Sequence, residues 1–423
     1  MNPLRSARLA FDLLTAEGPA ALARRAVDRL IEQADRNSFT SRQEWPREAA
    51  IPTLYVLATP PSPRLGGVQA QLVARRARER AAGRPFALFY PWAGRYRLEL
   101  EHGGDRAALD LAPAPVGPIE APAEPEPGPW VRAIRDAFAR CGAESLRIEG
   151  AAGLPLTGLL ELSAVLPLTL AIHDFALFCP RPHLVEEPDG GFCRWSRDLL
   201  RCTICLTQSW PVAPDYQALR RTLASRLLRG CEHAVFPSSF LLHSHLELFS
   251  TLDAVRCRIE APPLLARPIP GYRPQKPPRR IAFVGAAKAF KGADLFAEIV
   301  VDLVPRHPEI EWHAFGGGEA ELQKKLRAAG VEVHGYYRAG TLPAQLARHR
   351  IDLALLLSIV PESYGLTLDE CALARVPFLT FDLGAQAERA AGLGGAVLPL
   401  AEGAAGVAGR IAETISPEST QRL

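Results

Sequence analysis

Short apolar runs alternate with amphipathic stretches along most of this chain. In the amino-terminal half, apolar runs predict strands, and stretches such as "VQAQLVARRARER" and "WVRAIRDAFARCG" have the period of helices. Alternation of this kind is typical of a parallel sheet with helices on both faces. The predicted strands are "TLYVLATP", "PFALFY", "YRLELE", "SLRIEG", "LTLAIHD" and "HAVFPSS".

A proline-rich stretch at 263–278 interrupts the alternation and predicts a linker. After it the pattern restarts with "RRIAFVG", "IEWHAFG", "VEVHG", "DLALLLS" and "PFLTFD", the last clear strand. The sequence therefore predicts an α/β protein with two Rossmann-like domains that face a cleft, at 51–262 and 279–423. Residues 1–50 form a predicted helical extension.

Length and composition fit two soluble domains. The chain has 423 residues, 48% hydrophobic and 22% charged, and a net charge of +3. That charge is too balanced for affinity based on neutralising phosphates, so no nucleic-acid partner is expected. The longest apolar run, 154–172, contains Glu161 and two prolines and predicts a buried helix and strand, not a membrane span. Acidic residues interrupt the amino terminus, so no export signal is expected and a reducing cytoplasm is the predicted compartment.

The loop after the strand "RRIAFVG" has the composition of an anion site. Gly285, Lys288, Lys291 and Gly292 join this strand to a predicted helix. Amides at a helix start together with ammonium groups suit a diphosphate. The alternative is that both lysines only solvate a surface loop.

Two carboxylates flank a turn after the strand "DLALLLS". Glu362 follows this strand, and Glu370 lies about two turns into a helix that begins near Gly365. Carboxylates accept hydrogen bonds from vicinal hydroxyls, so this pair can hold two sugar rings, with the amides of residues 364–366 facing the phosphates between them. The alternative is that both are ordinary surface acids.

With these motifs in place, residues 281–390 resemble the carboxyl-terminal domain of GT-B glycosyltransferases of the family 4 type. The matching segments read "FVGAAKAFKGADLF", "WHAFGGGEAEL" and "VPESYGLTLDECALARVPFLTFDLGAQAE". The resemblance implies that Glu362 contacts the donor sugar, Glu370 the ribose, and Lys291 the diphosphate. Ala286 and Ala287 stand where the family has an Arg, for which Lys288 is the substitute.

The resemblance continues more loosely upstream. It implies that the 66–67 glycine pair approaches the donor phosphates and that His173, in "AIHDF", lies near the transferred sugar. The implied catalytic residues are His173, Glu362 and Lys291. The implied donor-binding residues are Gly66, Gly67, Gly285, Lys288, Lys291, Gly292, Ser363, Tyr364, Gly365, Leu366 and Glu370.

Four cysteines share one segment of the first domain. Cys179, Cys193, Cys202 and Cys205 follow the spacing C-x13-C-x8-C-x2-C. Four thiolates with a C-x2-C half suit a structural zinc ion, so a zinc-holding insertion at about 176–210 is predicted. A disulfide pair, unrelated thiols or an iron–sulfur cluster are the alternatives. A similar insertion occurs in some bacterial surface-polysaccharide glycosyltransferases.

The resemblance implies a retaining glycosyltransferase that uses a UDP- or GDP-linked sugar. Its expected acceptor is a glycan or lipid-linked glycan at the inner face of the cytoplasmic membrane. No D-x-D stands in a suitable loop, so catalysis without a metal is expected. The alternative is a catalytically weak or inactive binding or scaffold protein. A dehydrogenase is disfavoured because "GGGEAE" lacks the last glycine of G-x-G-x-x-G.

Overall fold

The computed structural model describes residues 26, 51–61, 67–115 and 126–416. Its described residues form two compact units, one up to Pro263 and one from Leu264. The predicted helical extension at 1–50 lies outside the described residues apart from Ala26, and Gly66 lies outside them as well.

The first unit is built on an eight-stranded sheet with the order β4-β3-β2-β1-β5-β6-β7-β8. β1 pairs in parallel with both β2 and β5, and the parallel pairing continues to β8. β3 and β4 extend the other edge as an antiparallel hairpin. The strands are β1 (Thr53–Val56), β2 (Phe86–Trp92), β3 (Arg95–His102), β4 (Asp105–Pro113), β5 (Ser145–Glu149), β6 (Leu168–Ala171), β7 (His233–Phe236) and β8 (Cys257–Ile259).

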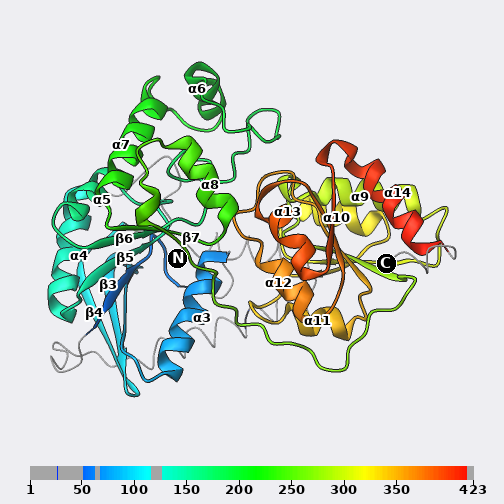
Figure 1. Ribbon diagram of the computed structural model, residues 1–423, viewed down its shortest axis with the longest axis horizontal. Helices are drawn as coiled ribbons and strands as arrows, with labels where there is room; N and C mark the ends of the chain where they lie inside the picture. The colour runs from blue at the N-terminus through cyan, green and yellow to red at the C-terminus, as the bar shows by residue number, and fades with distance from the viewer. Residues whose placement is uncertain (1–25, 27–50, 62–66, 116–125, 417–423) are drawn as a thin grey trace. The chain divides into compact units, whose positions relative to one another are not determined.

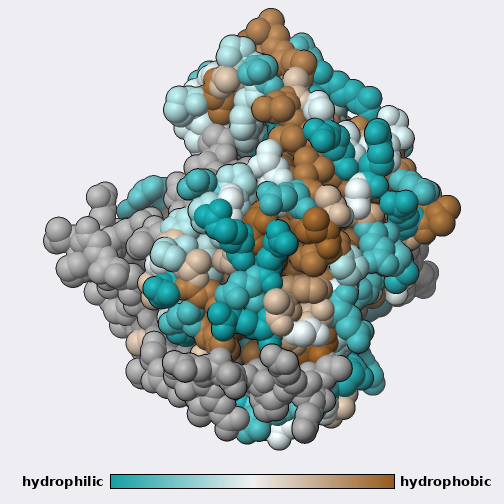
Figure 2. Space-filling model, turned by 90° about the vertical axis from the view of Figure 1, so that its left-hand side faces the viewer, coloured by the Kyte–Doolittle hydropathy of each residue, from teal (hydrophilic) through white to brown (hydrophobic). Residues whose placement is uncertain are grey.

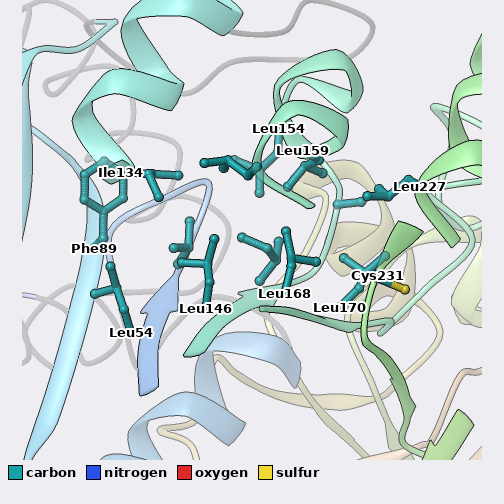
Figure 3. Close-up of a cluster of buried hydrophobic side chains, with 14 of the residues drawn as sticks. Leu54, Phe89, Ile134, Leu146, Leu154, Leu159, Leu168, Leu170, Leu227 and Cys231 are labelled. Carbon is teal, nitrogen blue, oxygen red and sulfur yellow. The ribbon is translucent and has the colours of Figure 1, made fainter. Parts of the chain in front are cut away.

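Side chains of the central strands alternate between two hydrophobic layers. Leu54 and Val56 join a large cluster with the helices α4, α5 and α7. Leu57, with Leu88 of β2, packs against α3 on the other face. Figure 3 shows the large layer, and Figure 1 shows α4 and α5 on one side of the sheet and α3 on the other. The helices are α3 (Gly67–Ala81), α4 (Pro127–Cys141), α5 (Leu156–Ser163), α6 (Leu199–Thr207), α7 (Tyr216–Gly230) and α8 (Ser239–Leu248).

The second unit has a six-stranded parallel sheet with the order β11-β10-β9-β12-β13-β14. Numbered within the unit, this is 3-2-1-4-5-6, the Rossmann order. The strand order therefore reverses between the adjacent strands β9 and β12, which form the topological switch point of the sheet. The strands are β9 (Arg280–Val284), β10 (Glu311–Phe315), β11 (Glu332–Gly335), β12 (Leu353–Leu356), β13 (Phe378–Phe381) and β14 (Gly395–Leu398).

Alternation along β9 also divides this sheet into two covered faces. Ile281 and Phe283 pack with α9 and α14, and Ala282 and Val284 pack with α11 and α12. Figure 1 shows these two helix pairs on opposite sides of the second sheet. The predicted fold class, α/β with two parallel-sheet domains, is confirmed. The helices are α9 (Ala293–Leu303), α10 (Ala320–Ala328), α11 (Leu342–Arg348), α12 (Leu366–Leu373), α13 (Gly384–Ala390) and α14 (Gly403–Ile415).

Candidate functional site

The candidate site of the second unit lies at the carboxyl ends of β9 and β12. In open α/β sheets, ligands bind beyond the carboxyl ends of the strands where the strand order reverses. Here that point receives the loop 285–292 from β9 and the loop 357–365 from β12. Both loops are those in which the sequence predicted chemistry.

Close backbone packing fixes the β9 loop, and Gly292 makes this packing feasible. Gly292 has φ of +83°, and a Cβ there would lie 2.1 Å from the carbonyl oxygen of Leu357. The carbonyl of Phe290 accepts a hydrogen bond from the Ile359 amide at 3.0 Å. The lysine-bearing loop is therefore anchored on the end of β12.

Lys291 and Glu362 meet at this point. Their ammonium and carboxylate groups form an ion pair, and each side chain keeps a little over a fifth of its surface exposed. The Glu362 carbonyl accepts a hydrogen bond from the Ala385 amide at 2.8 Å, which fixes its backbone against α13. A cation and a hydrogen-bond acceptor are thus presented together at the carboxyl ends of two central strands.

Glu370 is buried on α12, four residues after the first residue of the helix. The helix begins at Leu366 after Gly365, which has φ of +78°, so the predicted helix start is confirmed. Burial raises the pKa of Glu370 to about 7, although the Gly340 amide donates a hydrogen bond to its carboxylate and opposes the rise. A carboxyl group poised near neutrality can take either protonation state there.

Arg389 of α13 supports the turn between Glu362 and Glu370. It was not predicted from the sequence. Its guanidinium stacks 3.7 Å from the centre of the Tyr364 ring and donates to the Tyr364 carbonyl at 2.9 Å. It also donates to Asp369 at 2.7 Å. No local pattern marks this arginine, because its partners lie at least twenty residues away.

Lys288 is placed differently from Lys291. Its side chain is exposed, with Nζ 5.4 Å from the centre of the Phe290 ring, and Lys291 Nζ lies 5.6 Å from the same ring. Ala287, at the position of the missing arginine, is buried and exchanges backbone hydrogen bonds with Gly317 and Glu319. Lys288 and Lys291 together supply the positive charge of this loop.

In the first unit, His173 and Glu149 end the neighbouring strands β6 and β5. His173 Nε2 lies 2.8 Å from Glu149 Oε2, and both side chains are buried. The other ring nitrogen of His173 is buried without a hydrogen-bond partner among the described residues. The sequence reading named His173 but missed Glu149, for which an acid at the end of an apolar strand is a usable signal.

His173 and Arg147 favour the ionised form of Glu149. Burial alone would raise the pKa of Glu149, but the bond from His173 and the charge of Arg147 outweigh it and lower the pKa to about 2. Arg147 donates to Glu149 at 2.8 Å and bridges to Glu260 at 3.0 Å. His173 is therefore oriented by a carboxylate that stays charged.

The four predicted metal ligands line one small cavity. Cys179 follows β6, Cys193 follows an isolated bridge between Val185 and Phe192, and the remaining two lie on α6. The cavity has a volume of about 20 Å³, roughly the space of one water-sized sphere. All eight cysteines lie within the described residues and are free thiols, so the structure does not contain the alternative disulfide pair.

Two hydrogen bonds point at sulfur in this cavity. The Glu187 amide donates to Cys205 Sγ at 3.3 Å, and Arg221 donates to Cys202 Sγ at 3.4 Å. Burial and the other three cysteines raise the pKa of Cys179 to about 12, which a nearby cation would reverse. The four cysteines share this cavity, and zinc binding by them stays a prediction.

Helix α6 presents apolar side chains outward. Leu199, Leu200 and Ile204 are 44%, 71% and 51% exposed. Figure 2 shows apolar side chains at the top of the molecule, where Figure 1 places α6. Among the described residues, no helix has both the length and the hydropathy that a bilayer span requires.

Comparison with protein families identifies the second unit. Residues 278–416 match the family model described as glycosyl transferases group 1. The resemblance to GT-B glycosyltransferases is thereby confirmed. The match contains Lys291, Glu362 and Glu370 of the group 1 domain. No curated protein matches the sequence.

Solved structures share the fold of most of the chain. The pneumococcal O-GlcNAc transferase GtfA in complex with UDP and GlcNAc is similar with a TM-score of 0.56 and 10% identity, covering 86% of this chain and 91% of its own. Sucrose-phosphate synthase from Thermosynechococcus elongatus has a TM-score of 0.55 and 14% identity, covering 86% and 89%. Anabaena HepE in complex with UDP and glucose has a TM-score of 0.51 and 13% identity, covering 87% and 90%. At these identities the comparison shows a shared GT-B fold.

Proposed function

We propose that this protein is a retaining glycosyltransferase that moves a sugar from a UDP-linked donor to a glycan or lipid-linked glycan. The observation that carries the proposal is the meeting of Lys291 and Glu362 at the switch point of a group 1 domain. The donor base is proposed from the UDP bound in two proteins of the same fold.

Each residue has a role that follows from its chemistry. Lys291, Lys288 and the first amides of α12 stabilise the negative charge of the leaving diphosphate. Glu362 accepts hydrogen bonds from sugar hydroxyls, and Glu370 accepts them from the ribose. The charge on the diphosphate is balanced by these groups without a catalytic metal.

His173 acts on the sugar side in this proposal. Glu149 accepts the hydrogen of Nε2, which leaves the opposite ring nitrogen to accept a hydrogen bond from a sugar hydroxyl. The leaving phosphate accepts the proton of the acceptor hydroxyl as the new bond forms on the same face of the sugar, so the configuration at the anomeric carbon is retained. Gly67, at the start of α3, offers backbone to the donor phosphates.

The cysteine segment is proposed to be a zinc-stabilised insertion at the acceptor side. Its outward apolar residues on α6, with Arg194 and Arg197 in the same segment, suit a peripheral contact with an anionic membrane surface. This placement supports a lipid-linked acceptor and a role in bacterial surface-polysaccharide synthesis. Binding to anionic vesicles that is lost in Leu200→Ser with Ile204→Ser tests this contact.

The deciding experiment measures UDP release from a panel of UDP-sugars by the purified full chain with lipid-linked glycan acceptors. One donor is expected to turn over, and Glu362→Ala is expected to abolish its turnover while the protein stays folded. The anomeric configuration of the product, read by nuclear magnetic resonance, tests retention. Binding of UDP without turnover of any donor would favour the scaffold alternative, which the alanines at 286 and 287 support.

A further inference from the structure

A second cluster of ligating side chains lies away from the nucleotide site. It consists of His313 on β10, Glu332 and His334 on β11, and His349 directly after α11. One nitrogen or oxygen atom of each residue lies within 4.8 Å of those of the other three. Three imidazoles and a carboxylate form a common donor set for zinc.

Strand pairing brings three of these residues together. His313 is directly opposite Glu332 in the parallel β10–β11 ladder. The register then shifts, so that Phe315 is opposite Gly335 and the ladder passes over His334. His334 stacks on the Phe315 ring with centroids 4.3 Å apart, which turns its ring toward the face that α11 covers.

The distances fit a tetrahedral ion. His313 Nδ1 lies 3.1 Å from His334 Nε2 and 3.4 Å from Glu332 Oε2. Zinc with ligands at about 2.0–2.1 Å places its ligand atoms about 3.3 Å from one another. The His349 ring lies 4.0 Å from the His334 ring, centre to centre, and supplies the fourth donor.

A hydrogen bond between His313 and His334, without a metal ion, explains less of this arrangement than a bound ion does. It accounts for the contact between His313 and His334, but it requires neither the third imidazole nor the carboxylate at the same point. His313 is buried, and its other ring nitrogen, Nε2, has no hydrogen-bond partner among the described residues.

We propose that His313, Glu332, His334 and His349 bind one divalent ion of the zinc class. The ion joins the edge strand β11, which pairs only with β10 in its sheet, to the end of α11. In the sheet order, β10 separates β11 from β9, whereas the candidate nucleotide site lies at the junction of β9 and β12. The site is therefore structural and separate from transfer.

The test uses the untagged full chain, stripped of metal and titrated with Co²⁺. Cobalt held by thiolates shows sulfur charge-transfer absorption, and cobalt held by imidazoles shows only ligand-field bands. The Cys202→Ser, Cys205→Ser double variant removes the thiolate signal and isolates the histidine site. In this background one equivalent of ion is expected, with imidazole-type bands and a zinc-induced rise in melting temperature on the order of 5 °C.

Replacing one ligand must remove that equivalent. His349→Ala and His334→Ala are each expected to lose the imidazole-type bands and the melting shift, whereas His307→Ala, outside the cluster in the same unit, keeps both. If the cysteine variant does not fold, the comparison is made in the wild-type background instead. There, His349→Ala is expected to bind one equivalent of metal fewer than the wild type. Unchanged metal content in His349→Ala and His334→Ala, or no imidazole-type band in the wild type, overturns the proposal.

Discussion

Lys291 and Glu362 form an ion pair across 71 positions of sequence, at the carboxyl ends of two adjacent strands. Each residue comes from a different loop, and the strand order alone brings the loops together. The pair places a positive charge and a hydroxyl acceptor where a sugar diphosphate would present both of its groups. Each side chain is partly exposed, so the pair is free to exchange partners when a ligand arrives.

Lys291→Met is expected to lower kcat/KM for the donor by about 10²–10³-fold, because a cation aimed at the leaving diphosphate acts mainly in the transition state. Stability should change by less than about 1 kcal/mol, since partly exposed ion pairs contribute little. Steady-state UDP release and thermal unfolding measure both quantities. Lys288→Met, which removes the exposed ammonium near the same Phe290 ring, is the control and should lose less activity. Equal losses in both variants would contradict a specific role for Lys291.

Glu370 predicts a pH dependence of nucleotide binding. Its pKa in the folded protein is about 7, raised by burial, and its ionised form is the one that accepts hydrogen bonds from ribose hydroxyls. Affinity for UDP should therefore fall by about tenfold between pH 8 and pH 6. Isothermal titration calorimetry at both values measures it. Glu370→Gln separates this effect from titration of the UDP phosphate. In this variant, the pH dependence of UDP affinity should come from the phosphate alone.

The same group affects stability in the opposite direction. A carboxyl group with a raised pKa in the folded state contributes stability at low pH, and this contribution is lost as pH rises from about 4.5 through 7. Without ligand, the wild type should therefore lose stability relative to Glu370→Gln over that window. A difference between the two proteins that does not vary with pH would show that folding does not raise the pKa of Glu370.

Glu149→Gln tests how His173 is oriented. Loss of the charge leaves Nε2 of His173 and the guanidinium of Arg147 with a weaker acceptor, so kcat should fall by about 10–100-fold. The first unit should lose about 1–3 kcal/mol of stability. Because the pKa of Glu149 is lowered, this difference should persist from pH 8 to about 4.5 and shrink as pH falls toward 2.

Activity assays and hydrogen exchange of the β5 and β6 amides measure these two effects. Glu144→Gln, at an exposed position one residue before β5, is the matched control and should change neither. Wild-type activity in Glu149→Gln would mean that His173 needs no charged partner.

The sequence predicted the fold because its strands are apolar and regularly spaced. β8, three residues with the sequence CRI, and β14, which follows a glycine-rich turn, escaped detection because edge strands bury little and carry little pattern. Lys291 and Glu362 were found because their chemistry lies at strand ends. Arg389 was missed because its partners are at least twenty residues away and only the folded topology brings them together. Glu149 was missed although it ends an apolar strand, the same signal that marked the other site residues.

Gly292 links the fold to the site, and substituting it separates two physical effects. Gly292→Ala places a methyl group 2.1 Å from the Leu357 carbonyl oxygen and also forces φ of +83° on alanine. Gly330→Ala, with φ of +90° and no atom within 4 Å of its Cβ, imposes only the backbone strain, about 1–2 kcal/mol. Unfolding measurements should show a larger loss in Gly292→Ala, together with reduced UDP release, because the loop that carries Lys291 must leave the end of β12. Equal destabilisation in the two variants, with donor turnover intact in both, would show that the close contact with Leu357 does not position Lys291.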